Sequence, residues 1–165
     1  MLVLYASQAN FQAQFADQAK QLQANLGDSC TIEHVGSTAV PGVEGKGIID
    51  ILIGFETAEQ LKRAVIVLSH HGYYGGTTQK RNNYLFMAST ENESTLGDTH
   101  IHLTLKASKT FKDFLTFRDY LRLHPDTAKA YSELKHRIAQ ECNFDREAYR
   151  KKKGSFIKNL IRMAS

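Results

Sequence analysis

The stretch EHVGSTAVPGVEGKGIIDILIG (33–54) joins a glycine-rich loop to an apolar run that contains one aspartate, Asp50. Because nearly every position of IIDILIG (48–54) is apolar, this run predicts a strand that is buried on both faces of a sheet. A carboxylate inside such a strand is strongly unfavourable unless a cation or several hydrogen-bond donors hold it. Asp50 is therefore a candidate catalytic residue. The ordinary alternative is a carboxylate that caps a helix or accepts backbone hydrogen bonds.

The preceding segment, GSTAVPGVEGKG (36–47), has four glycines and one proline in twelve residues, which predicts a loop. Gly36 and Ser37 open this loop at the end of the predicted strand CTIEHV (30–35), where backbone N–H groups and a hydroxyl can bind a phosphate. Lys46, near the end of the loop, could reach the same phosphate. The spacing of a P-loop is missing. The alternative is that the loop only turns the chain and that Lys46 is solvated.

A second cluster is predicted by HIHLTL (100–105), in which alternation places His100 and His102 on one face of a strand. Side chains at i and i+2 lie about 6.5–7 Å apart, so two imidazoles can converge on one ion. His34, at the end of the first strand, could complete the set with Asp50. Two imidazoles and one carboxylate suit Zn, Mn or Fe. The alternative is a structural or solvated histidine pair.

Composition indicates a single soluble domain over residues 1–165, because hydrophobic residues make up 42% and charged residues 23% of the chain. No apolar run approaches the roughly 20 residues of a spanning helix, so no membrane partner is expected. The N-terminus has no basic flank before its short apolar start, which favours a cytoplasmic protein over a secreted one. Cys30 and Cys142 lack metal-type spacing and are expected to be free thiols.

Charge divides the chain in two. Residues 1–105 hold 6 Lys/Arg against 10 Asp/Glu, a net −4, and residues 106–165 hold 15 against 7, a net +8. The first part has a helix pattern at 8–26 and several predicted strands, with NYLFMAS (83–89) and HIHLTL as an antiparallel pair. The second part predicts three helices, from about Thr110, from Pro125 and after Asp145. An α+β sheet-bearing half followed by a basic helical half is therefore expected.

The basic residues have two interpretations. Arg81, ahead of the third strand, could clamp an anion, or it could be an ordinary strand-edge arginine. The run RKKK (150–153) looks like a nucleic-acid tag, but four consecutive residues spread around a helix axis, so solvation is the better interpretation.

Four separated blocks resemble the GrpB family: IEHVGSTAVPGVEGKGIIDILIGF (32–55), HIHLTL, FRDYLRLHPDTAKAYSELK (117–135) and DREAYRKKKGSFI (145–157). GrpB proteins resemble the nucleotidyltransferase superfamily that includes DNA polymerase β. The resemblance implies a nucleotidyltransferase-like mixed β-sheet packed by helices and followed by a C-terminal helical segment. It also implies a nucleotide or another phosphorylated small molecule as partner, and a divalent cation, Mn, Zn or Mg, as cofactor.

In that superfamily a strand ends in Gly-Ser, a later strand bears two metal-binding acids two residues apart, and a third acid follows on another strand. The resemblance implies that Gly36 and Ser37 bind phosphate and that Asp50 is the first acid. Leu52 takes the place of the second acid, and His100 or His102 that of the third. Two-metal phosphoryl transfer needs several carboxylates, and Mg prefers oxygen ligands. This departure argues against ordinary Mg-dependent nucleotide transfer.

Three hypotheses follow. The chain transfers a nucleoside monophosphate with a divalent cation, or it binds a nucleotide without catalysis through a degenerate site. The third is RNA binding by the basic half, which ranks last because no platform of interleaved aromatic residues is evident.

Overall fold

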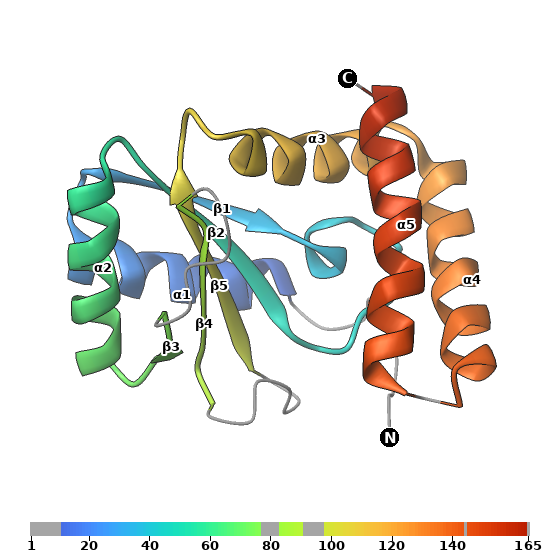
Figure 1. Cartoon of the computed structure of the whole chain (residues 1–165), viewed down its shortest axis with the longest axis horizontal. Helices are drawn as coiled ribbons and strands as arrows, with labels where there is room; N and C mark the ends of the chain where they lie inside the picture. Colours follow the sequence, from blue (N-terminus) through green and yellow to red (C-terminus); the bar gives the residue numbers. More distant parts are fainter. Residues whose placement is uncertain (1–10, 77–82, 91–97, 144, 165) are drawn as a thin grey trace.

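The computed structural model describes residues 11–76, 83–90, 98–143 and 145–164. Within these ranges the chain forms a five-stranded sheet in the order β1-β2-β5-β4-β3, with helices on both faces (Figure 1). The strands are β1 (Cys30–Val35), β2 (Ile49–Phe55), β3 (Tyr74–Gly75), β4 (Leu85–Ala88) and β5 (Thr99–Leu105). The helices are α1 (Phe11–Leu26), α2 (Ala58–His70), α3 (Lys109–Leu123), α4 (Pro125–Glu141), α5 (Arg146–Ala164) and the short 3-10 helix η1 (Ser37–Ala39).

The sheet is mixed. β1 pairs antiparallel with β2, β2 pairs parallel with β5, and β4 and β3 continue antiparallel from β5. The predicted antiparallel pairing of β4 with β5 and the α+β class are therefore confirmed. The parallel pairing of β2 with β5 sets the register of the candidate site, because it places Asp50 beside His100 and Leu52 beside His102.

One face of the sheet carries the main apolar core. The alternate residues Ile49, Ile51 and Ile53 of β2 point to this face, where α1 and α2 cover them. Ile101 and Leu103 of β5 join the same cluster, as the alternation in HIHLTL predicts. The histidines of β5 are consequently directed to the opposite face.

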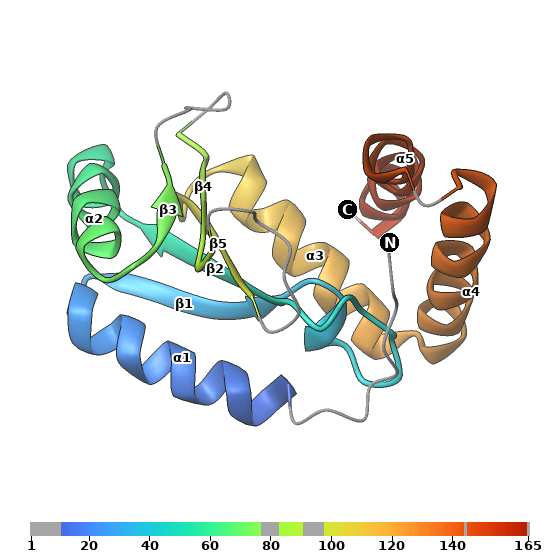
Figure 2. The ribbon, with the colours of Figure 1, turned by 90° about the horizontal axis from the view of Figure 1, so that it is seen from below.

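The opposite face is covered by α3, so that α1 and α3 lie on opposite sides of β1 and β2 (Figure 2). Leu52 and Val35 pack there against Phe111 of α3. The hairpin of α4 and α5 packs in turn against the far end of α3, with Phe117 and Tyr131 in a shared apolar cluster. The basic helical half thus extends the second face of the sheet.

Side-chain caps and a proline mark the starts of four helices. Thr57 caps α2 in a capping box with Gln60, Pro125 stands in the first turn of α4, and Asp145 Oδ1 accepts the Ala148 N–H. Ser108, whose side chain accepts the Phe111 N–H, caps α3. Cys30 and Cys142 are both free and buried, as expected. Among the helices of the described ranges, none has the length and apolar character needed to cross a membrane.

Candidate functional site

The turn after β1 depends on Gly36. Its backbone has φ 73° and ψ −167°, a combination that is essentially restricted to glycine. A Cβ on Gly36 would collide with the Asp50 carboxylate and would lie 2.9 Å from Asp50 Cβ. The absence of a side chain therefore lets the Gly36–Ser37 turn lie directly against Asp50.

Asp50 is held by the two histidines of β5. The distance from Asp50 Oδ1 is 3.5 Å to His100 Nδ1 and 3.3 Å to His102 Nε2. Burial alone would raise the pKa of Asp50, but the hydrogen bonds and charges of His100 and His102 outweigh it and hold that pKa well below its ordinary value. The partners that hold this partly buried aspartate are therefore imidazoles.

Each imidazole also has a second protein partner. His102 Nδ1 lies 2.7 Å from the hydroxyl of Tyr84, and His100 Nε2 lies 3.7 Å from Oδ2 of the buried Asp98. Asp98 accepts further hydrogen bonds from the backbone and side chain of Ser89. Sequence reasoning missed Tyr84 and Asp98, because neither stands in a spacing that indicates a site.

His34 does not join this group. It is opposite Ile51 in the β1–β2 register, whereas Val35 is opposite Asp50, so His34 lies on the other face of the sheet. There its ring stacks on Phe15 at 4.6 Å between centroids. Burial lowers the pKa of His34 to about 4, although Asp50 opposes the shift. The expectation that His34 completes the ligand set is corrected by this register.

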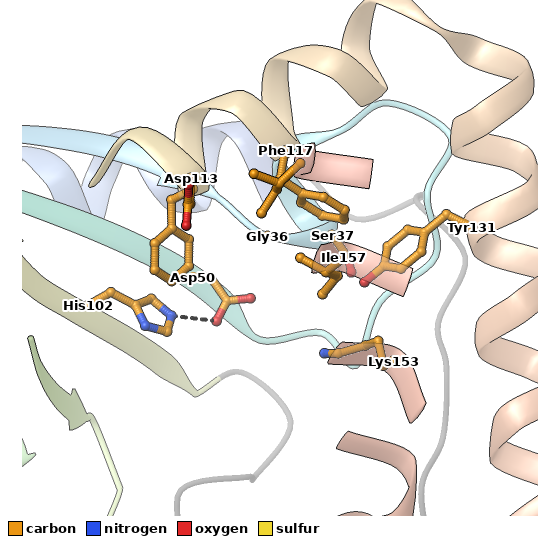
Figure 3. Close-up of a pocket in the computed structure, with 11 residues that line it drawn as sticks. Gly36, Ser37, Asp50, His102, Asp113, Phe117, Tyr131, Lys153 and Ile157 are labelled. Carbon is orange, nitrogen blue, oxygen red and sulfur yellow. Dashed lines mark hydrogen bonds and ion pairs between the residues drawn. The ribbon is translucent and has the colours of Figure 1, made fainter. Parts of the chain in front are cut away.

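A cavity of about 240 Å³ lies beside Asp50, between the sheet and the helical half (Figure 3). β2 and β5 contribute Asp50 and His102, and the turn contributes Gly36 and Ser37. The remaining lining residues come from α3, α4 and α5: Asp113, Phe114, Phe117, Tyr131, Lys153, Ile157 and Ile161. The cavity thus has one polar end, at the turn and the sheet, and a wall from the helical half that is apolar except for Asp113 and Lys153.

Lys153 is the cation that lines this cavity. It extends from α5 toward the side on which Asp50 lies (Figure 3). Burial lowers the pKa of Lys153, while the charge of Asp50 opposes that shift. The interpretation of the RKKK run as solvated holds for Lys152, which is exposed and pairs with Glu141 at 2.7 Å. It is wrong for Lys153, which lines the cavity. The missed signal was the spacing of Lys153, Ile157 and Ile161, which puts a lysine on the apolar stripe of the helix.

The other predicted phosphate ligands lie elsewhere or outside the described residues. Lys46 Nζ lies 5.2 Å from the centroid of the Tyr149 ring, and Lys46 is not among the described residues that line the cavity. Arg81 falls outside the described residues. The predicted group that the structure brings together is therefore Gly36, Ser37, Asp50 and the two histidines of β5.

Two arginines of α3 fix the strand and turn that precede the cavity. Arg118, a buried residue, donates to Glu33 Oε2 at 2.7 Å and to the carbonyl of His34 at 3.1 Å. Arg122 donates to the carbonyl of Ala39 at 2.9 Å. These bonds tie α3 to β1 and η1, so the turn is positioned by the helical half as well as by the sheet.

The donor set does not fit a pair of divalent cations. Leu52, at the place of the second acid, is fully buried and apolar, whereas a two-metal site requires several carboxylates. Both nitrogens of His102 and of His100 have protein partners. Within the part of the chain that the structure describes, no group of three or more His, Cys, Asp or Glu side chains is arranged to hold an ion. A cation at Asp50 stays a prediction.

Comparisons with solved structures define the class of the fold. Structures of Cid1, described as an RNA terminal uridylyl transferase and a poly(U) polymerase, superpose with TM-scores of 0.56 and 0.57 at 12% and 13% identity. They match 83% of this chain but only 41% and 44% of Cid1. At this identity the likeness concerns the fold alone, which is nucleotidyltransferase-like.

The chain belongs to the GrpB family, because the model of the family described as GrpB protein matches residues 2–163. The crystal structure of the conserved protein GrpB from Enterococcus faecalis superposes with a TM-score of 0.86 at 27% identity, over 98% of this chain and 96% of that one. A UPF0157 protein of Pseudomonas aeruginosa is 35% identical over 89% of this chain, which spans 61% of that relative's length. The glutamate-rich protein GrpB of Alkalihalophilus pseudofirmus is 29% identical over 97% of this chain and 94% of its own.

Proposed function

We propose that the cavity binds a nucleotide or another phosphorylated ligand, with a phosphate at the Gly36–Ser37 turn. The observation that carries this proposal is the convergence of the turn with Lys153 of α5 on one cavity (Figure 3). An ammonium group and a hydroxyl are suitable donors for phosphate oxygens. The nucleotidyltransferase-like fold supports the same assignment by analogy.

The apolar wall supports a ligand that has more than a phosphate. Phe114, Phe117 and Ile157 line the cavity on the side of the helical half. Ligand sites usually combine such walls with a few convergent polar groups. A base or another flat apolar group would be buried against this wall, while its phosphate faces Ser37 and Lys153. Asp50, held ionised by its histidines, would repel a phosphate placed too deep and so limits its position.

Binding without transfer is the form of the proposal that the geometry favours. Leu52 is buried where a second acid would be needed, and both imidazoles beside Asp50 are already paired within the protein. Transfer of a nucleoside monophosphate with a divalent cation is the second candidate, favoured by the position of Asp50 beside the turn. It would require the histidines to release Asp50 when a cation binds.

The test is a thermal-shift screen with ATP, CTP, GTP, UTP and coenzyme A, each with Mg, Mn or Zn and with EDTA. A ligand at a hundred times its dissociation constant stabilises by about 2.7 kcal/mol, which raises Tm by roughly 5–10 °C in a chain of this size. The Lys153→Met variant should lose the shift. The matched control is Lys158→Met, at an exposed position of the same helix, which should keep it.

The outcomes separate the candidates. A shift that persists in EDTA and disappears in Lys153→Met supports phosphate binding without a metal. A shift that requires a metal and disappears in Asp50→Asn supports the transfer candidate and justifies a search for an acceptor. The proposal fails if no compound shifts the wild-type Tm, or if Lys153→Met and Lys158→Met respond alike.

A further inference from the structure

Lys135 is a buried lysine behind the phosphate turn, and sequence reasoning did not single it out. Its side chain is 1% exposed, at the middle of α4. Its ammonium donates to Ser37 Oγ at 3.3 Å and to the backbone carbonyl of Glu44, and it lies 4.9 Å from the centroid of the Tyr131 ring. Because a lysine is almost never fully buried without partners, this placement is a specific feature of the site.

The contact determines how Ser37 presents its hydroxyl. An ammonium group only donates, so Ser37 Oγ must be the acceptor from Lys135. The hydroxyl of Tyr131 points toward Ser37 as well (Figure 3), and the interaction with Ser37 lowers the pKa of Tyr131 against the larger, opposite effect of burial. With Lys135 as a donor to Ser37 Oγ, the hydroxyl proton of Ser37 is directed away from the ammonium group, toward Tyr131 or toward a ligand oxygen in the cavity.

The charge on Lys135 is finely balanced. Burial, together with the charges of Lys153 and Lys46, lowers the pKa of Lys135 to about 7, although Glu44 opposes the shift. The charged or titratable groups that face its ammonium come from the loop after η1, from α4 itself and from α5: Glu44, Lys46, Tyr131 and Lys153. Three of these four carry no negative charge at neutral pH, so an added phosphate would strongly favour the ammonium form.

We propose that Lys135 is a positioning residue of the phosphate site, which orients Ser37 from behind the turn and takes up a proton when a phosphorylated ligand binds. This inference rests on the proposed function of the cavity. Lys135 does not need to touch the ligand. It acts through Ser37 and through its charge, which lies on the far side of the turn from the bound phosphate.

The experiment is calorimetric titration of ATP into the full chain, near pH 8 and near pH 6, in pairs of buffers with different ionisation enthalpies. Near pH 8 the wild-type protein should take up about half a proton or more on binding, because a nearby opposite charge raises the pKa of Lys135 by about 1–3 units. Near pH 6 the uptake by Lys135 should vanish, because the ammonium is already formed. Affinity should fall as pH rises from 6 to 8.

Substitutions in α4 test whether Lys135 is the source of this proton uptake. Lys135→Met should bind ATP about tenfold or more weakly and should lose the additional proton uptake near pH 8. Lys129→Met, at an exposed position of α4, should behave as the wild type. If Lys135→Met fails to fold, Lys135→Arg, which stays charged at both pH values, should bind ATP without the additional proton uptake near pH 8, and uptake equal to that of the wild type would overturn the inference.

Two other results would overturn the inference while leaving the proposed function intact. These are wild-type binding of ATP with the same proton uptake at both pH values, or unchanged affinity in Lys135→Met. A wild-type protein that binds no ATP at all would instead remove the proposed function for this ligand, and the inference with it.

Discussion

Replacement of Gly36 by alanine tests the closeness of the turn to Asp50. A non-glycine residue at this φ and ψ costs about 1–3 kcal/mol. The new methyl group would also collide with the Asp50 carboxylate and lie 2.9 Å from its Cβ. Displacing that carboxylate weakens its bonds to the two histidines, each a charge-assisted bond worth about 1.5–3 kcal/mol. The expected loss in the free energy of unfolding is therefore about 3–6 kcal/mol.

Gly42 supplies the matched control. Its φ is 75°, close to the 73° of Gly36, but a Cβ there would have nothing within 4 Å. Gly42→Ala should therefore cost only the backbone term, about 1–2 kcal/mol. The larger loss in Gly36→Ala combines the contact with Asp50 and the more restricted backbone of Gly36, and the double variant with Asp50→Ala separates the two effects.

The assay is urea denaturation followed by circular dichroism, with the midpoint and slope fitted for each variant. The combination Gly36→Ala with Asp50→Ala removes the carboxylate and should recover part of the loss, so the two changes should be non-additive. Equal losses in Gly36→Ala and Gly42→Ala, or strict additivity with Asp50→Ala, would refute the packing argument.

Three further predictions concern stability. Because His34 has a pKa of about 4 when folded and 6.5 when unfolded, the unfolded state binds more protons between these values. Stability should therefore fall by about 3 kcal/mol as pH drops from 6.5 to 4, and urea midpoints of His34→Gln should lack this slope. Lys135 has a pKa of about 7 in the folded protein and 10.5 in the unfolded chain, so the unfolded state binds more protons between these values. The free energy of unfolding should therefore rise by about 2 kcal/mol from pH 7 to 9. If Lys135→Met shows the same dependence on pH as the wild type, this prediction is wrong. Arg118→Met should cost about 2–4 kcal/mol, because it removes the donor of a buried hydrogen bond to the His34 carbonyl and of a partly buried ion pair with Glu33. Arg137→Met, whose pair with Glu141 is exposed at 3.9 Å, should change the free energy of unfolding by less than about 0.5 kcal/mol.

The sheet half of the fold was predictable because strand periodicity is local. The alternation of apolar residues around Asp50 assigns each side chain of β2 to a face, and the same holds for the histidines of β5. What alternation could not decide was the register between strands. A shift of one residue in the register exchanges the two faces of a strand. In the observed register His34 is opposite Ile51, and Val35 is opposite Asp50.

The helical contribution to the site was harder to predict, because it depends on contacts between distant segments. Lys135 and Ser37 are separated by 98 positions in the sequence. Lys135 lies on the buried stripe of α4 with Tyr131 and Ile138, so helical spacing could have indicated its burial. Its contact with Ser37, in contrast, follows only from the packing of α4 against the turn. The position of Lys153 in the cavity was easier to predict, because Lys153 shares a helical stripe with Ile157 and Ile161.

Because α5 supplies one wall of the cavity, the cavity is completed late in the synthesis of the chain. Synthesis proceeds from the N-terminus, and a domain generally folds as a unit. The sheet, the Gly36–Ser37 turn and Lys135 all precede α5, whereas Lys153, Ile157 and Ile161 close the cavity last. The closed cavity can therefore form only after α5 has been synthesised, and the capacity to retain a ligand depends on this helix.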